Sequence, residues 1–393
     1  MMTLDLPPGE HALAPLSDED AVELLQALVR MPTENPPGDV AEAVEWLATT
    51  LESRGHPVER HPVPDPFARH HGRTGLTNLV LRHRFGDGPV LALHAPLDTL
   101  PVGSGWANDP FEAVVRDGRL IGRGAADAKG SLVAFIAAVE RVVAAQPTRG
   151  TLELHVTADE ESGGALGPAF LLSQGLASPD AVISAGSAHQ VVIGQQGVVH
   201  LEVILRGRQA HAARASDGRD AIAASVPLLK ALEDQPVVVS TIAGGRGENV
   251  VADRVRFTLD RRLSAGEDGA DVEAGLIALL ERAHTAADVE LECRRRLIAE
   301  PVTPTPAAEA LAAVICEEAA DVLGRGVSVV SAPVVTSARH YAHAGIPAAL
   351  YGAGPPTVAE GVDPGHDEYV ALSDLAAATK VVTRAALRRL QGD

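Results

Sequence analysis

The chain has 393 residues, which is long enough for two domains with separate hydrophobic cores. Its formal net charge of −19 argues against nucleic acid or an anionic membrane as a partner, because phosphate groups are bound by clustered cations. The only two cysteines, Cys293 and Cys316, lack CxxC spacing, so the sequence predicts neither a disulfide framework nor a thiolate zinc site. With no signal-peptide pattern and no run of eighteen apolar residues, we expect a soluble cytoplasmic protein.

The first half of the sequence alternates between predicted helices and predicted strands. Ser17 and Asp20 have capping-box spacing, and apolar residues then recur at helical intervals over 18–30. A second amphipathic helix ends at Gly55, a candidate left-handed cap. Strands are expected at 77–82, 90–94 and 151–157, and a helix at about 131–145. This alternation predicts an α/β fold with a mostly parallel sheet.

The pattern changes at about Val198, where three segments alternate polar and apolar residues. They are VVHLEVILRG, RVRFTLDRRL and DVELECRRRL, and helical patterns at about 219–233 and 270–284 lie between them. This βαββαβ-like order predicts an inserted α+β domain at 198–305. The segments 1–197 and 306–393 would then be the two parts of one α/β domain.

The return to the α/β domain begins after PVTPTP, at 301–306, which has the composition of a linker. A helix, a strand and a second helix are expected after it, at 307–323, 346–352 and about 371–390.

Acidic residues follow one apolar strand directly, in TADEESGG at 157–164. Loops beyond the carboxyl ends of parallel strands are where such sheets bind ligands. The adjacent Glu160 and Glu161 point in different directions, so one can bind a metal ion while the other acts as general base on a metal-bound water. The alternative is a solvated acidic turn.

Three further segments carry acids or histidines near strand or helix ends. GRGAADAKG matches no phosphate-binding fingerprint, so its Asp127 is either a carboxylate that bridges two cations or an N-cap. His94 and Asp98 fit the pattern of a metal-ligating histidine that is oriented by a carboxylate. His366, in DPGHDEYV, belongs to a fourth cluster of this kind. Four such clusters in one chain favour a shared site.

Motifs along nearly the whole chain resemble one family of enzymes. They are MPTENPPGDVAEAVEWLATTLESRG, LDTLPVGSGWANDPFEAVVRDGRLIGRGAADAKGSL, TADEESGG, LRGRQAHAA, GENVVADRVRFTLDRRLSAGED, AGIPAALYGAG and HDEYVALSDL. In order and spacing they resemble the co-catalytic zinc metallopeptidases, which include acetylornithine deacetylase, succinyl-diaminopimelate desuccinylase, aminoacylase and bacterial glutamate carboxypeptidase. The resemblance implies a zinc-binding α/β domain and a lid domain at about 198–305 that mediates homodimerisation.

The resemblance also implies roles for residues at the metal centre. Asp127 matches the bridging metal ligand, and Glu161 matches a ligand to one of the two ions. Glu160 matches the general base, and Asp98 matches the carboxylate that orients the metal histidine.

Other matches concern the lid and the substrate. His211 matches the lid histidine that reaches the partner subunit's site and stabilises the tetrahedral oxyanion, although an ordinary surface histidine is the alternative. Asn249 and Arg262 match lid positions that contact substrate, and Arg339 matches a contact to the substrate carboxylate.

Two histidines of the family pattern are displaced in this sequence. Pro96 stands where the first motif has its histidine, and Pro364 stands where the last motif has its own. His94 and His366 each lie two residues from the expected position. Two residues along a strand retract a side chain by roughly 6.6 Å, so His94 is either a shifted ligand or a core histidine.

A third ligand is missing from PDAVISAGSAHQ, where Gly186 stands in place of an acid and His189 is a speculative substitute. In addition, Ser337 replaces a common aspartate. The sequence therefore predicts one zinc ion rather than two, held by Asp127, Glu161 and His366, with cobalt, manganese or no metal as alternatives.

Three functions remain open on these residues. The first is a metal-dependent amidohydrolase that cleaves an N-acyl amino acid or a small peptide-like amide, with Glu160 activating a metal-bound water. The second is a metal-poor or metal-independent member that uses Glu160 in another acyl-transfer or amide-forming reaction of specialised metabolism. The third is a non-catalytic homodimer that binds a small ligand.

Overall fold

The computed structural model describes residues 14–71, 75–355 and 367–392. The chain divides into two compact units, and each is described by itself. The first unit consists of Met1–Gly194 and Pro304–Asp393, and the second consists of Gln195–Thr303.

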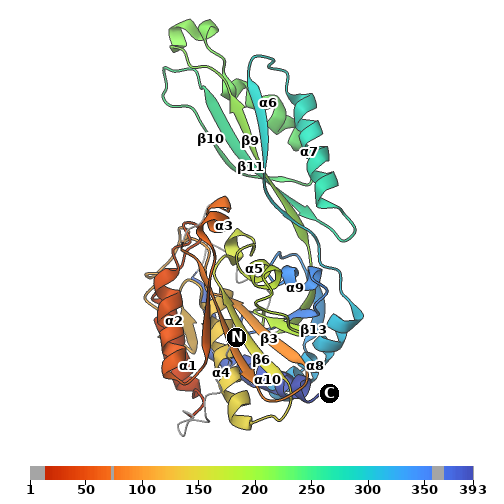
Figure 1. Cartoon of the computed structure of the whole chain (residues 1–393). Coiled ribbons are helices and arrows are strands. Elements are labelled where there is room, and N and C mark those ends of the chain that lie inside the picture. Colours follow the sequence, from red (N-terminus) through yellow and green to blue (C-terminus); the bar gives the residue numbers. More distant parts are fainter. Residues whose placement is uncertain (1–13, 72–74, 356–366, 393) are drawn as a thin grey trace. The chain divides into compact units, whose positions relative to one another are not determined.

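The first unit is built around an eight-stranded sheet with the strand order β1-β2-β6-β3-β7-β14-β8-β13 (Figure 1). The bounds are β1 Val58–Pro62, β2 Thr77–Arg84, β3 Val90–Pro96, β6 Thr151–Thr157, β7 Ala181–Ser184, β8 Gln190–Gln195, β13 Ser328–Ala332 and β14 Ala348–Leu350. The neighbouring strands β6, β3, β7 and β14 run parallel, whereas β1, β2 and β8 pair in antiparallel fashion. The carboxyl ends of β3 and β6 therefore lie at the same edge of the sheet.

Helices cover this sheet, and its central strands β3, β6 and β7 are buried along nearly their whole length. Helices α4 (Gly130–Ala145) and α10 (Leu372–Gln391) pack against each other and against β3 and β6 (Figure 1). Helix α4 is buried along most of its length. The other long helices are α1 Asp18–Val29, α2 Ala41–Ser53 and α8 Pro306–Leu323. The short helices are α3 Asp65–His70, α5 Pro168–Ser173 and α9 Arg339–His343, and the short strands β4 Val114–Arg116, β5 Arg119–Ile121 and β15 Tyr369–Ala371 form a separate sheet.

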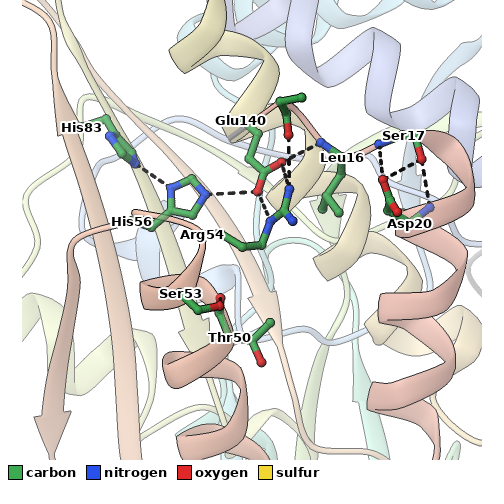
Figure 2. Close-up of polar contacts among 10 residues, drawn as sticks. Leu16, Ser17, Asp20, Thr50, Ser53, Arg54, His56, His83 and Glu140 are labelled. Atoms are coloured by element: carbon green, nitrogen blue, oxygen red, sulfur yellow. Dashed lines mark hydrogen bonds and ion pairs between the residues drawn. The ribbon is translucent and has the colours of Figure 1, made fainter. Parts of the chain in front are cut away.

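A buried polar cluster fixes the start of the described chain to the first unit (Figure 2). The Glu140 carboxylate, on α4, accepts hydrogen bonds from Leu16 N at 2.7 Å, Arg54 Nε at 2.6 Å and Arg54 Nη2 at 2.8 Å. His56 Nε2 lies 3.2 Å from the same carboxylate, and its Nδ1 lies 3.0 Å from His83 Nε2. Four donor groups thus surround one buried acid.

The second unit is a four-stranded antiparallel sheet with two helices. Its order is β10-β11-β9-β12, from β9 Gly197–Arg206, β10 Val238–Gly244, β11 Arg254–Leu263 and β12 Glu290–Ala299. Helices α6 (Ala221–Leu232) and α7 (Gly269–Ala283) share one apolar core with the sheet. The order along the chain is β9-α6-β10-β11-α7-β12, so the predicted α/β fold with a βαββαβ insert is confirmed.

One strand differs from the sequence expectation, and one helix end agrees with it. The strand expected at 346–352 is shorter and covers Ala348–Leu350. The second helix, Ala41–Ser53, ends at the expected left-handed cap, because Gly55 has a φ of +82°, a conformation that glycine adopts without steric cost. Within the described ranges, no helix has the length and apolar character needed to cross a membrane.

Candidate functional site

Four acidic side chains come together where β3 and β6 end. Pro96, the last residue of β3, pairs with Thr157, the last of β6, so the loops that follow leave the sheet side by side. The β3 loop carries Asp98 and the β6 loop carries Glu160 and Glu161, and Asp127 approaches them from the loop before α4. The convergence expected from the sequence is present in the structure.

Asp98 is the anchor of this acidic cluster. It is buried, and its carboxylate accepts hydrogen bonds from Asn35 Nδ2 at 2.8 Å, Glu160 N at 3.1 Å and Glu161 N at 3.2 Å. Among the described residues no histidine donates to Asp98, so its contacts do not support the predicted role of orienting a metal histidine. Asp98 instead fixes the backbone of both glutamates. Asn35 was not predicted as a site residue, although it lies within the motif MPTENPPG.

Glu160 and Glu161 have few donors around their own carboxylates. Ser337 N donates to Glu160 Oε1 at 3.2 Å. Burial raises the pKa of Glu160 to about 8, and the negative charges of Asp127 and Asp98 add to this effect. Burial, and to a smaller extent repulsion from Glu160, raises the pKa of Glu161 to about 10. Without a cation, both side chains carry protons at neutral pH.

Asp127 stands in a loop that Glu368 shapes. Glu368 is buried and accepts hydrogen bonds from Arg123 Nη1, Gly124 N, Ala126 N and Asp127 N at 2.8 to 3.0 Å. Asp127 keeps an exposed edge, yet the protein around it limits the hydration of its carboxylate and, with the charge of Glu368, raises its pKa to about 7. The sequence identifies Glu368 only as part of the motif HDEYVALSDL, because donors that come from one distant loop leave no local pattern.

His94 lies in the core and not among these acids. Its side chain has no solvent exposure, and its Nδ1 and Nε2 atoms lie 2.8 Å from Ser184 Oγ and 3.1 Å from Thr157 Oγ1. Burial, with a smaller contribution from His155, lowers the pKa of His94 to about 3. Because both ring nitrogens already have partners, the structure argues against His94 as a metal ligand and agrees with the alternative, a core histidine.

The Gly186 position has no room for a metal-binding side chain. A Cβ atom there would lie 2.9 Å from Leu350 C and from Tyr351 N, which are backbone atoms of the neighbouring segment. His189, the speculative substitute, has its Nε2 atom 2.9 Å from Asp374 Oδ2 and its Nδ1 atom in contact with Arg325. Both observations argue against a ligand from this segment.

The described residues therefore do not fit the two-zinc centre that the resemblance implies. Asp127 and Glu161 remain as candidate ligands, and His366 lies outside the described residues. Within 14–71, 75–355 and 367–392, no group of three or more histidine, cysteine or acidic side chains has an arrangement that could hold a metal ion. Catalytic zinc sites use three protein ligands and an open position.

Arg339 and Arg262, which were predicted to contact the substrate, are hydrogen-bonded to other groups of the protein. Arg339 is buried, and its Nη1 and Nη2 atoms donate to Thr336 O and Gly163 O. In the second unit, Arg262 Nε and Nη2 donate to the Asp260 carboxylate.

His211 and Asn249 are neighbours within the second unit. The exposed His211 begins a short 3-10 helix, and its Nδ1 accepts from Ala213 N at 3.1 Å. Ala212 N donates to Asn249 O at 2.9 Å. The roles of these two lid residues stay predictions.

Comparison with known proteins places this chain in a family. Peptidase family M20/M25/M40 matches residues 92–388. The chain is 29% identical over 299 residues to a succinyl-diaminopimelate desuccinylase of Marinobacter nauticus. The aligned residues cover 70% of this chain and 76% of that protein. It is 32% identical to the desuccinylase of Rhizorhabdus wittichii, over 64% of this chain and 70% of that protein.

Solved structures of low sequence identity share the fold. A metallo-carboxypeptidase of the M20 family from Sulfolobus solfataricus matches with a TM-score of 0.78 and 17% identity, over 94% of this chain and 98% of that chain. A dinuclear metal-binding M20 peptidase from Bacillus subtilis matches with a TM-score of 0.66 and 17% identity, over 96% and 99%. The predicted family and the predicted enzyme class are thereby confirmed. The chain belongs to peptidase family M20/M25/M40, a family of metal-dependent enzymes that hydrolyse amide bonds.

Proposed function

We propose that this chain cleaves the amide bond of an N-acyl amino acid or a small peptide-like substrate, and that Glu160 transfers the proton in this reaction. The observation that carries the proposal is the position of the Glu160 carboxyl group and its raised pKa. It lies beyond the carboxyl end of β6, accepts a hydrogen bond from Ser337 N, and has a pKa raised to about 8 by burial and by the neighbouring acids. A group with a pKa near the working pH both accepts and returns a proton efficiently.

The proton transfers balance within hydrolysis. Ionised Glu160 takes a proton from the attacking water, whose oxygen forms a bond to the amide carbon. As the carbon–nitrogen bond breaks, Glu160 returns this proton to the leaving nitrogen. Asp98 keeps the glutamate loop in place throughout, because its carboxylate binds the backbone N–H groups of Glu160 and Glu161.

We also propose that the chain binds at most one metal ion, with zinc, cobalt and manganese as the candidates. The supporting observations are the bonded ring of His94 and the closed position at Gly186. Mass spectrometry of the elements in protein purified without chelator is expected to find one ion per chain or none. Two tightly bound ions per chain would contradict this part of the proposal.

We propose that the chain forms a homodimer through the second unit. Strand β10 is an edge strand whose residues are exposed along its whole length, including Val238 at 62% and Ile242 at 57%. On α6, Ile222 and Val226 are also exposed. An exposed apolar edge is suited to pairing with a second chain.

We also propose a cytoplasmic location, and the free state of both cysteines supports a reducing compartment.

The test is a panel of N-succinyl and N-acetyl amino acids and dipeptides, assayed with EDTA and with added Zn²⁺, Co²⁺ or Mn²⁺. We expect turnover of at least one substrate and a loss of about 10²- to 10⁴-fold in Glu160→Gln. Glu45→Gln, at an exposed glutamate of α2 that pairs with Arg60, is the matched control and is expected to keep full turnover. Equal turnover by Glu160→Gln and wild type would exclude the proposed role.

One observation favours a second candidate, an acyl transfer to an amine that needs no metal ion. The described residues offer few metal ligands but keep the glutamate that moves a proton. An amine in place of water would lose a proton to Glu160 as its nitrogen bonds to the acyl carbon of an activated ester, and Glu160 would return this proton to the leaving alcohol oxygen as the carbon–oxygen bond breaks. Amide formation from an activated acyl ester and an amino acid, without hydrolysis of the acyl amino acids above, would favour this second function.

A further inference from the structure

The loop that carries Glu160 is packed against the start of α9. Arg339 Nη1 donates to Thr336 O at 3.2 Å, and its Nη2 donates to Gly163 O. His340 Nε2 donates to the same Gly163 carbonyl at 2.8 Å. One carbonyl, three residues after Glu160, therefore accepts hydrogen bonds from two consecutive side chains of α9.

The two segments also touch without room for an extra atom. Gly164 has a φ of +72°, and a Cβ atom on it would lie 2.6 Å from Ser337 Cβ and 3.1 Å from His340 Cδ2. The same Ser337 supplies the N–H group that donates to Glu160 Oε1. A shift of the loop relative to α9 would therefore change the hydrogen bond on the Glu160 carboxylate.

From this geometry we propose that Arg339 and His340 are positioning residues: they hold the Gly163 carbonyl and so keep the Glu160 carboxyl group in its place beside Ser337 N. Arg339 is 5% exposed, and both of its terminal nitrogens are bound to backbone carbonyls, which is a poor arrangement for contacting a substrate carboxylate. This inference rests on the proposed function of Glu160. It replaces the substrate contact that the family resemblance implies for Arg339.

The kinetic test compares an N-acyl amino acid with its C-terminal amide, which lacks the free carboxylate. We expect Arg339→Ala to lower kcat by about tenfold to hundredfold for both substrates with little change in KM, because a small displacement of the reacting group slows the chemical step. Arg339→Lys keeps one donor and is expected to restore part of kcat, and His340→Ala should have a smaller effect in the same direction. A rise in KM confined to the substrate with the free carboxylate would overturn the proposal.

A second measurement needs no turnover. Hydrogen exchange of the segment 157–166 reports whether the glutamate loop loosens. We expect faster exchange there in Arg339→Ala and His340→Ala, with other segments of the first unit unchanged. Arg54→Ala, which removes a different partly buried arginine of the same unit, is the control and should leave 157–166 unchanged. Unchanged exchange in Arg339→Ala would refute the proposed contact.

The two measurements separate the possible failures. If wild type turns over no substrate of the panel but Arg339→Ala loosens 157–166, the proposed function fails and the positioning contact stands. If wild type is active and Arg339→Ala changes neither kcat nor exchange, the positioning role fails and the proposed function stands.

Discussion

Two glutamates of the same unit, Glu140 and Glu160, lie in opposite environments. Burial alone would raise the pKa of Glu140, but hydrogen bonds from Arg54, His56 and Leu16 N lower it to about 2 (Figure 2). Burial and the neighbouring acids raise the pKa of Glu160 to about 8, against the opposing effects of the hydrogen bond from Ser337 N and of the charge of Arg339. The difference is the supply of donors and positive charge, since both carboxyl groups are surrounded by protein.

The comparison shows how to separate a structural acid from a reactive one. A carboxylate with donors on both oxygens is fixed in its charged form and stabilises the fold. A carboxyl group with one donor and acidic neighbours keeps a titrating proton, at a cost to stability, and such perturbed groups gather at functional sites.

The largest expected effect on stability comes from removing the structural acid. Glu140→Ala would leave Arg54 and His56 without their buried partner, and we expect the free energy of unfolding to fall by about 3–5 kcal/mol. Urea denaturation measures this change. Glu45→Ala, which removes an exposed partner of Arg60, should cost less than about 1 kcal/mol. Similar losses in both variants would contradict the assigned difference.

Acid titration of the fold tests the same acid in the wild type. The pKa of Glu140 is lowered from 4.5 to about 2, so its stabilising contribution is fully present above pH 4.5 and is lost as the pH falls toward 2. Thermal unfolding at pH 5, 4 and 3 should show a smaller decline in Tm for Glu140→Gln than for wild type. Parallel curves would mean that Glu140 does not titrate as described.

The anchor of the acidic cluster offers an intermediate case. Asp98→Ala would leave the N–H groups of Glu160 and Glu161 and the amide of Asn35 without their acceptor, at a cost of about 1–3 kcal/mol in unfolding free energy. Catalytic turnover should fall as well, because the glutamate loop loses its attachment. Asp98→Asn keeps an acceptor oxygen and should lose less stability. A variant as stable as wild type would show that Asp98 is not an anchor.

The effect expected for Glu161 has the opposite sign. The folded state raises the pKa of Glu161 to about 10, so above pH 4.5 the unfolded chain releases a proton that the folded chain keeps, and stability falls as the pH rises toward 10. Glu161→Gln removes this cost, so with EDTA present its free energy of unfolding at pH 8 should exceed that of wild type. The gain should be absent at pH 4.5. A loss of stability at pH 8 would contradict the raised pKa.

Local sequence patterns predicted most of the fold. The capping box at Ser17 and Asp20 forms as expected, and the alternating segment RVRFTLDRRL is strand β11, Arg254–Leu263. Periodicity works for such elements because it records which face is buried. The acidic cluster was also predictable, because loops that follow neighbouring parallel strands meet at one edge of the sheet.

The parts of the site that depend on contacts between distant residues could not be predicted from the sequence. The two partners of the His94 ring, Ser184 and Thr157, come from the strands on either side of β3, so only the sheet order reveals that the ring is fully bonded. Likewise, Arg339 resembles a substrate contact in the sequence, whereas its partner Gly163 lies 176 residues away. Motif matching identifies positions, but hydrogen-bond partners across the fold decide what those positions do.

The most direct test of the central claim compares Glu160→Gln with Glu140→Gln, each measured as turnover per folded molecule on the best substrate of the panel. We expect Glu160→Gln to lose about 10²- to 10⁴-fold in kcat while its stability is unchanged or increased. We expect Glu140→Gln to lose stability but to keep its turnover per folded molecule. Full activity in Glu160→Gln would show that Glu160 does not transfer the proton.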